Sequence, residues 1–236
     1  MAITLDQATV FFGNDGGVGD NPAVFTTTGT VASGAYVFVA ICSNLLPSAV
    51  TVGGTSATKA RDQQQTDFAS LWYVLKSSGM SSGASISVSF AAVPNFCEAA
   101  AFSFTGLATS SVLDQVNSQG ATASGTAWST SSITPTASPS LVVGYANFFS
   151  SDIRSTPDTG WTELFDGFQF NLFQIVYQVV SDTAARNPSG VLASNPGVVD
   201  RRAVTANFLD AAAGGSSSSR AVERLTLQAV MRAATF

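Results

Sequence analysis

The sequence predicts an all-β protein, an antiparallel jelly-roll β-sandwich with a C-terminal extension. Three observations predict this class: apolar residues recur with the period of strands, turn-forming residues separate the apolar runs, and one order of segments occurs twice. Of the 236 residues, 45% are hydrophobic and 11% are charged. A chain of this size and composition can bury a full core without disulfides or metals.

The predicted strands are short and rich in Val, Ile, Phe and Tyr, which suit a pleated and half-buried surface. In Ser85–Phe90, for example, Ile86 and Val88 alternate with serines, so one face is apolar and the other polar. Gly, Pro, Ser and Asn cluster between the runs and favour turns there. The predicted strands are Tyr36–Cys42, Ala69–Leu75, Ala84–Phe90, Cys97–Thr105, Leu141–Phe149, Leu172–Val180 and Arg201–Leu209.

The repeated order of segments has an offset of 102 to 105 residues, which is too long for a solenoid. Two similar four-stranded halves that interleave would form one eight-stranded jelly roll over residues 1–212. Two separate small sandwiches are the alternative, but the strand-like stretch Val112–Val116 between the halves favours one body. The matching segments are Gly34–Ile41 with Pro139–Ala146, Phe68–Leu75 with Phe170–Tyr177, and Ala100–Leu107 with Val204–Asp210.

The last residues of the chain form a predicted docking arm. A Ser/Gly linker over residues 213–220 precedes an apolar stretch over residues 221–236, whose period fits either a strand or a helix. We expect this arm to bury its apolar residues on a neighbouring subunit, with a fold-back on its own domain or a disordered tail as alternatives. Its expected partner-binding residues are Leu225, Leu227, Val230, Met231 and Phe236.

Composition excludes several classes of function. The chain has no histidine, which excludes a Ser-His-Asp triad and every histidine-based metal site. Its net charge of −5 argues against nucleic-acid binding, and no apolar run reaches the length of a membrane span. The first residues, Met1–Phe12, lack the basic start of a secretory signal. Because histidine-based catalysis and metal binding are excluded, we expect the protein to be no enzyme and to bind no cofactor.

Two small groups of residues bear on the chemistry that remains possible. Cys42 and Cys97 lie in apolar runs and are expected to be reduced core residues, with a disulfide as the alternative. Asp158, Glu163 and Asp166 surround Trp161, and two carboxylates beside an aromatic ring could hydrolyse a glycoside. Trp161 itself begins an apparent strand, a position that favours the core over a sugar site.

A cation site and an aromatic patch complete the candidates. Asn14, Asp15 and Asp20 lie in a Gly-rich segment and could present oxygens to calcium, although the EF-hand order is missing and a plain turn is the alternative. An aromatic cluster could form a contact patch for a ligand or a partner if it is exposed, or enter the core if it is not. Its residues are Trp161, Phe165, Phe168 and Phe170.

The succession of strand motifs resembles a β-sandwich domain found in phage virion proteins and bacterial surface proteins. The resemblance covers roughly residues 26–212, and its motifs are loose. They are Tyr36–Val39, Val50–Thr55, Leu71–Tyr73, Ile86–Phe90, Phe102–Leu107, Leu113–Asp114, Pro139–Ala146 and Gly160–Leu164. In addition, Leu225–Arg232 resembles terminal extensions of phage tail and capsid-associated proteins.

The resemblance implies a structural or adhesive module carried on a particle surface. We therefore expect a non-enzymatic virion protein, either a capsid decoration or a head or tail spike component. It would reside on the virion, form a homo-oligomer and contact other capsid or tail subunits. The alternative is a glycan-binding module that attaches to host polysaccharide, and a glycosidase is the third reading.

Overall fold

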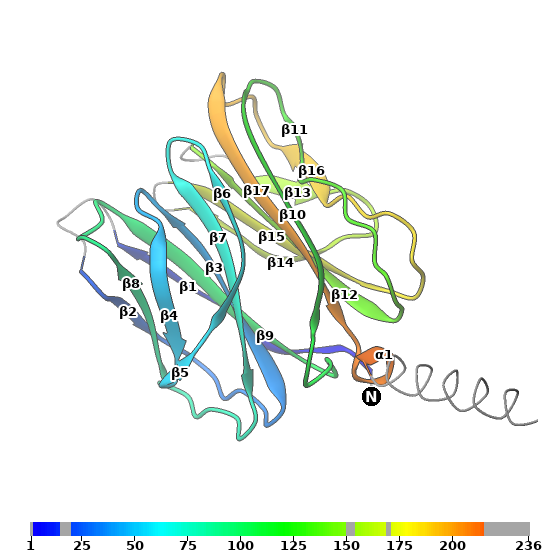
Figure 1. Cartoon of the computed structure of the whole chain (residues 1–236). Coiled ribbons are helices and arrows are strands. Elements are labelled where there is room, and N and C mark those ends of the chain that lie inside the picture. The colour runs from blue at the N-terminus through cyan, green and yellow to red at the C-terminus, as the bar shows by residue number, and fades with distance from the viewer. Residues whose placement is uncertain (1, 15–19, 150–153, 169–170, 215–236) are drawn as a thin grey trace, which may run out of the picture.

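A computed structural model describes residues 2–14, 20–149, 154–168 and 171–214 (Figure 1). Within these residues the chain forms antiparallel β-sheets and one short helix, α1 (Ala211–Gly214). The predicted all-β, antiparallel sandwich class is therefore confirmed. Its strands lie in two groups along the chain, which we call the N-terminal half (residues 2–105) and the C-terminal half (residues 113–210).

The N-terminal half contains two sheets. The five-stranded N-terminal inner sheet has the order β1-β9-β3-β7-β6, and the N-terminal outer sheet has the order β2-β8-β4-β5. The inner strands are β1 (Thr4–Asn14), β3 (Ala35–Ser43), β6 (Thr58–Gln64), β7 (Phe68–Lys76) and β9 (Cys97–Thr105). The outer strands are β2 (Ala23–Thr26), β4 (Pro47–Val52), β5 (Thr55–Ser56) and β8 (Ser85–Phe90).

The C-terminal half also contains two sheets. The C-terminal inner sheet has the order β10-β17-β12-β15-β14, and the C-terminal outer sheet has the order β11-β16-β13. The inner strands are β10 (Leu113–Ala123), β12 (Ser140–Phe148), β14 (Thr162–Phe168), β15 (Leu172–Val180) and β17 (Val199–Leu209). The outer strands are β11 (Ala127–Ser129), β13 (Ser155–Pro157) and β16 (Ser189–Leu192).

The four sheets stack as layers because the inner sheets are apolar on both faces. Along β3, Phe38 and Ala40 face the C-terminal inner sheet, whereas Val37 and Val39 face the N-terminal outer sheet. A sheet that is covered on both faces reads as a continuous apolar run rather than as an alternation. The order of layers is outer, inner, inner and outer, and the two inner sheets meet in the middle (Figure 1).

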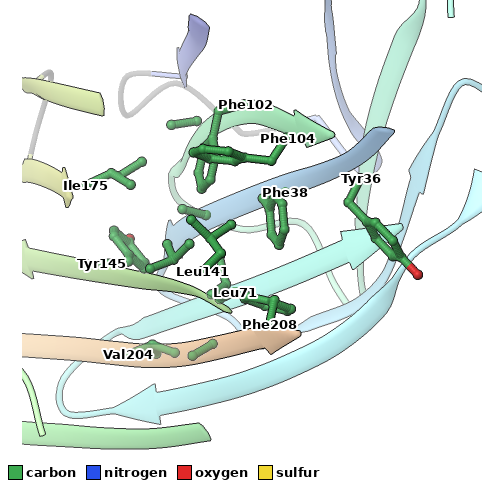
Figure 2. Close-up of a cluster of buried hydrophobic side chains, with 14 of the residues drawn as sticks. Tyr36, Phe38, Leu71, Phe102, Phe104, Leu141, Tyr145, Ile175, Val204 and Phe208 are labelled. Carbon is green, nitrogen blue, oxygen red and sulfur yellow. The ribbon is translucent and has the colours of Figure 1, made fainter. Parts of the chain in front are cut away.

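The largest core lies between the two inner sheets, and we call it the central core. Aromatic rings from both halves fill it (Figure 2). Phe38 stacks on Phe102 at 5.4 Å between ring centroids and meets Phe208 of the other half edge-on at 4.8 Å. The two halves therefore share one buried core. We call the boundary between the two inner sheets the seam, and in the described part of the chain no strand pairs across it.

The predicted interleaving of the two halves into one jelly roll is wrong. Every sheet pairs strands from one half alone, so each half is a two-sheet unit by itself. Sequence periodicity reports which faces of a strand are buried, but the backbone hydrogen bonds that join strands carry no sequence signature. The alternative of two sandwiches matches the strand pairing, but the shared central core makes them neighbours in one body.

The two inner sheets have the same strand order, and their registers correspond. β3 pairs with β9 so that Tyr36 lies opposite Phe104, and β12 pairs with β17 so that Leu141 lies opposite Phe208. These positions differ by 105 residues in the first strand and by 104 in the second. The correspondence gives each residue of β3, β7 and β9 an equivalent in the other half.

Both ends of the described chain meet at Gly106, beside the seam. The carbonyl of Gly106 accepts a hydrogen bond of 2.9 Å from the backbone N–H of Ala211, and a Cβ at Gly106 would collide with the carbonyl of Ala2. A glycine is needed there also because its φ is +81°. The first residues of the predicted linker, 213–214, belong to α1, whereas residues 215–236, including the predicted arm, lie outside the described residues.

Candidate functional site

A cluster of polar side chains lies inside the seam between the two inner sheets. Arg202 of β17 is 0% exposed, and its guanidinium donates to the carboxylate of Asp67 at 2.9 Å. Asp67 directly precedes β7 in the other half. A buried cation opposite a buried carboxylate is tolerated only because each charge compensates the desolvation of the other.

A second buried charge lies on the N-terminal half and binds a partner on the C-terminal half. Glu98 of β9 is 0% exposed, and its carboxylate accepts hydrogen bonds from Asn171. The backbone N–H of Asn171 donates at 3.2 Å, and its side-chain amide donates at 3.0 Å. Between the two charged contacts, the Cys42 thiol donates to the amide oxygen of Asn147 at 3.1 Å. We call these six residues the seam cluster.

The chemistry of the seam cluster is that of packing rather than of a nucleophile. Burial raises the pKa of the Cys42 thiol well above its usual value, and the nearby Arg202 charge only partly offsets this. Burial likewise raises the pKa of Tyr145 and, with the charge of Glu98, raises that of Cys97 to about 12. Neither thiol is ionised at neutral pH, and both are free, as the sequence predicted.

The raised thiol pKa values predict a loss of stability at alkaline pH. A thiol that ionises near pH 9 in the unfolded chain and near pH 12 in the folded one contributes stability that is complete below pH 9 and lost as the pH rises. For Cys97 we expect the free energy of unfolding to fall by about 1.4 kcal/mol per pH unit above pH 9. Urea denaturation of the protein and of a Cys97→Ala variant at pH 8 and pH 10 isolates this contribution. If the free energy of unfolding falls equally between pH 8 and pH 10 in the two proteins, the prediction is contradicted.

A cavity of about 250 Å³ lies between the C-terminal inner sheet and β11. Trp128 and Phe148 line it edge to face, with ring centroids 6.0 Å apart. The guanidinium of Arg201 lies 6.0 Å from the Phe148 ring and donates to the carbonyl of Gly125 at 2.6 Å. Aromatic rings beside a few polar groups are typical of small-ligand sites, although this cavity is somewhat smaller than most such sites.

Trp128 is held firmly at the cavity. Its indole N–H donates to the Ser155 hydroxyl at 2.8 Å, and the side chain is 5% exposed. Gly190 leaves room for the ring, because a Cβ there would lie 2.7 Å from the indole nitrogen and 2.5 Å from the carbonyl of Thr156. Trp128 gives no signal in the sequence, because its three-residue strand is too short to show a period.

The acidic residues near Trp161 do not converge on one catalytic geometry. Asp166 accepts a hydrogen bond from the backbone of Ser155 at 3.2 Å, and burial raises its pKa, with the charge of Glu163 adding to the effect. Glu163 accepts from the Gln174 amide, whereas Asp158 accepts from the Ser189 hydroxyl at 2.6 Å. Each of these carboxylates thus has a structural partner of its own.

The predicted aromatic patch is divided by the C-terminal inner sheet. Trp161 packs against the outer core of the C-terminal half, whereas Phe165 packs against the central core. A bulge between Glu163 and Phe165 and the alternation of side chains along the strand place the two rings against different cores. The side chains of Phe168 and Phe170 lie outside the described residues.

The predicted calcium site lies at the edge of the described chain. Asn14 ends β1 and Asp20 is exposed, whereas Asp15 lies outside the described residues. Within residues 2–14, 20–149, 154–168 and 171–214, no three acidic or cysteine side chains gather as a metal site. The arm residues Leu225, Leu227, Val230, Met231 and Phe236 also lie outside the described residues, so both sites stay predictions.

Comparison of the chain with protein-family models, with curated proteins and with solved structures gives no match. None of the helices in the described residues has the length and apolar character needed to cross a membrane.

Proposed function

We propose that this protein is a non-enzymatic structural component of a phage or phage-like particle, either a capsid decoration or part of a head or tail spike. The observation that carries this proposal is the use of the buried charges. Arg202, Asp67 and Glu98 all bind partners across the seam, where they hold two halves together. Layered sheets of this kind make a rigid body that can dock on a lattice while its loops face outward.

We further propose that the body consists of two copies of one sandwich unit and attaches through its C-terminal arm. The matching strand orders support two copies of one β-sandwich unit as the building blocks. By its strand motifs the chain resembles sandwich domains of virion proteins. The last described element, α1, is bonded to Gly106 beside the seam. An apolar arm that starts there and binds a neighbouring subunit would support a homo-oligomer or attachment to other virion proteins.

Deletion of residues 222–236 tests the docking proposal. We expect the shortened protein to keep the melting temperature of the full chain but to lose binding to purified particles and to elute as a smaller oligomer. The physical reason is that the arm supplies the apolar area of the contact, while the described body has its own cores. Size-exclusion chromatography with light scattering and co-sedimentation with particles measure the two effects.

A shortened protein that binds particles and oligomerises like the full chain would contradict the docking arm. As a control, Leu225→Ser and Leu227→Ser together should weaken binding, whereas Ser217→Ala in the linker should not. Failure of the full chain itself to co-sediment with particles would contradict the virion proposal.

A glycan-binding module is the second candidate function, and the cavity beside β11 is the observation that favours it. Trp128, Phe148 and Arg201 offer ring faces or edges and a cation there, and Gln119 adds an amide. Binding of the full chain to a glycan array, lost in Trp128→Ala but kept in Trp161→Ala, would favour this candidate. The two functions are compatible on one particle.

A further inference from the structure

We propose that the inner face of each half is built to pair with the other half and to reject a second copy of itself. This inference goes beyond the proposed function, because it concerns which surfaces assemble in any setting. It rests on the seam cluster, whose residues are equivalent in pairs between the two halves. A surface that meets its own copy around a two-fold axis makes every contact twice, with the two partners exchanged.

The registers of the inner sheets define the equivalent positions. Cys42 lies opposite Glu98 in the N-terminal half, and Asn147 lies opposite Arg202 in the C-terminal half. Glu98 and Arg202 are therefore equivalent, and so are Cys42 and Asn147. Asp67 and Asn171 are equivalent as well, because each directly precedes the matching strand, β7 or β15.

The contacts across the seam follow a two-fold relation. Cys42 bonds to its own equivalent, Asn147. The contact of Arg202 with Asp67 is the exchanged copy of the contact of Glu98 with Asn171.

Two aromatic pairs repeat this relation at the other end of the seam. Tyr73 meets Phe208 edge-on at 5.4 Å, and Tyr177 meets Phe104 edge-on at 5.0 Å. Tyr73 and Tyr177 are equivalent, as are Phe104 and Phe208. The halves thus pack like the two subunits of a symmetric dimer.

The charges break this symmetry, and the way they break it selects the partner. If two N-terminal halves met in the same way, Glu98 of each copy would face Asp67 of the other, and two pairs of buried carboxylates would repel. If two C-terminal halves met, Arg202 would face Asn171 twice, with no carboxylate for either guanidinium. Only unlike halves give Arg202 a carboxylate and Glu98 two N–H donors. Buried like charges and unpaired charges are strong devices against a wrong partner.

A single isosteric change tests the inference in the intact chain. Asn171→Asp places an aspartate opposite Glu98, which is the contact that two N-terminal halves would make. We expect its melting temperature at pH 7 to fall by about 10 °C, since two carboxylates then share one buried site. Adding Glu98→Gln should recover most of this loss, because the amide introduced at position 98 can donate to the new carboxylate and still accept the backbone N–H.

Two controls separate selection from general damage. Asn195→Asp is exposed, and its oxygen already accepts the backbone N–H groups of Gly125 and Gly197, so this variant should melt within about 2 °C of the parent. Asp67→Asn combined with Asn171→Asp should give no recovery and a further loss, because the carboxylates at positions 98 and 171 both remain and Arg202 loses its own carboxylate. The inference is overturned if Asn171→Asp melts within about 2 °C of the parent, or if Glu98→Gln fails to restore it while leaving the parent chain stable.

Discussion

Replacing Arg202 by methionine is expected to lower the free energy of unfolding by about 3–5 kcal/mol. The new side chain keeps most of the volume but leaves the carboxylate of Asp67 buried beside it without its cation. The ion pair is 2.9 Å long, and the arginine is 0% exposed, so water cannot readily replace the lost partner. Chemical denaturation followed by far-UV circular dichroism measures the effect.

A second change identifies the cause of that loss. The double variant Arg202→Met with Asp67→Asn should be more stable than Arg202→Met alone, because no charge is then left unpaired. As a control, Arg61→Met removes an exposed arginine that donates to Ser118 and should cost less than about 1 kcal/mol. Losses that simply add in the double variant would contradict the ion pair as the cause.

Replacing Phe208 by alanine is expected to cost about 3–5 kcal/mol, because it opens a cavity in the centre of the molecule. The ring is 0% exposed and meets Phe38 and Tyr73, both of the N-terminal half. The change should therefore destabilise both halves together, as one cooperative transition at a lower denaturant concentration. Val198→Ala, at a 73% exposed position, should change stability by less than about 0.5 kcal/mol.

Tryptophan fluorescence can tell whether the halves unfold together. Trp72 reports on the N-terminal half, and Trp128 reports on the C-terminal half. Variants of Phe208→Ala that keep either Trp72 alone or Trp128 alone, with the other two tryptophans replaced by phenylalanine, should show the same unfolding midpoint. Two midpoints, with the Trp72 signal unchanged from the parent, would mean that the central core does not couple the halves.

Apolar rings and buried charges have different roles between the two inner sheets. Apolar rings supply the area that holds the inner sheets together, and a few buried charges decide which sheets can meet. Apolar contacts are not directional, so they do not discriminate between partners. A misplaced buried charge is strongly unfavourable, so the charges do discriminate. The arrangement needs no catalytic role for any of the buried ionisable residues of the seam.

The central strands were predictable from the sequence, and several edge strands were not. The apolar run Tyr36–Cys42 predicted β3 to within one residue at each end. By contrast, β6 (Thr58–Gln64) is polar and only partly buried, so it carries no apolar alternation. An edge strand is held mainly by backbone hydrogen bonds to one neighbour, which many side chains allow.

The seam residues could have been suspected but not paired. Glu98 and Arg202 stand out as charges within apolar strands, a position that demands a partner. Their partners, Asp67 and Asn171, are distant in sequence and polar like many loop residues, so only the packed halves identify them. The cavity beside Trp128 is likewise lined by strands that are distant in sequence, β10, β11, β12 and β17.

The sequence by itself determined the strand class, the buried runs, the repeated order of segments and the absence of histidine chemistry. Tertiary structure alone decided that each half pairs its own strands, that the two inner sheets face each other, and that opposite charges meet between them. The reason is that side-chain periodicity is local, whereas the choice of strand partner is made by backbone groups common to all residues and by the fit of whole faces.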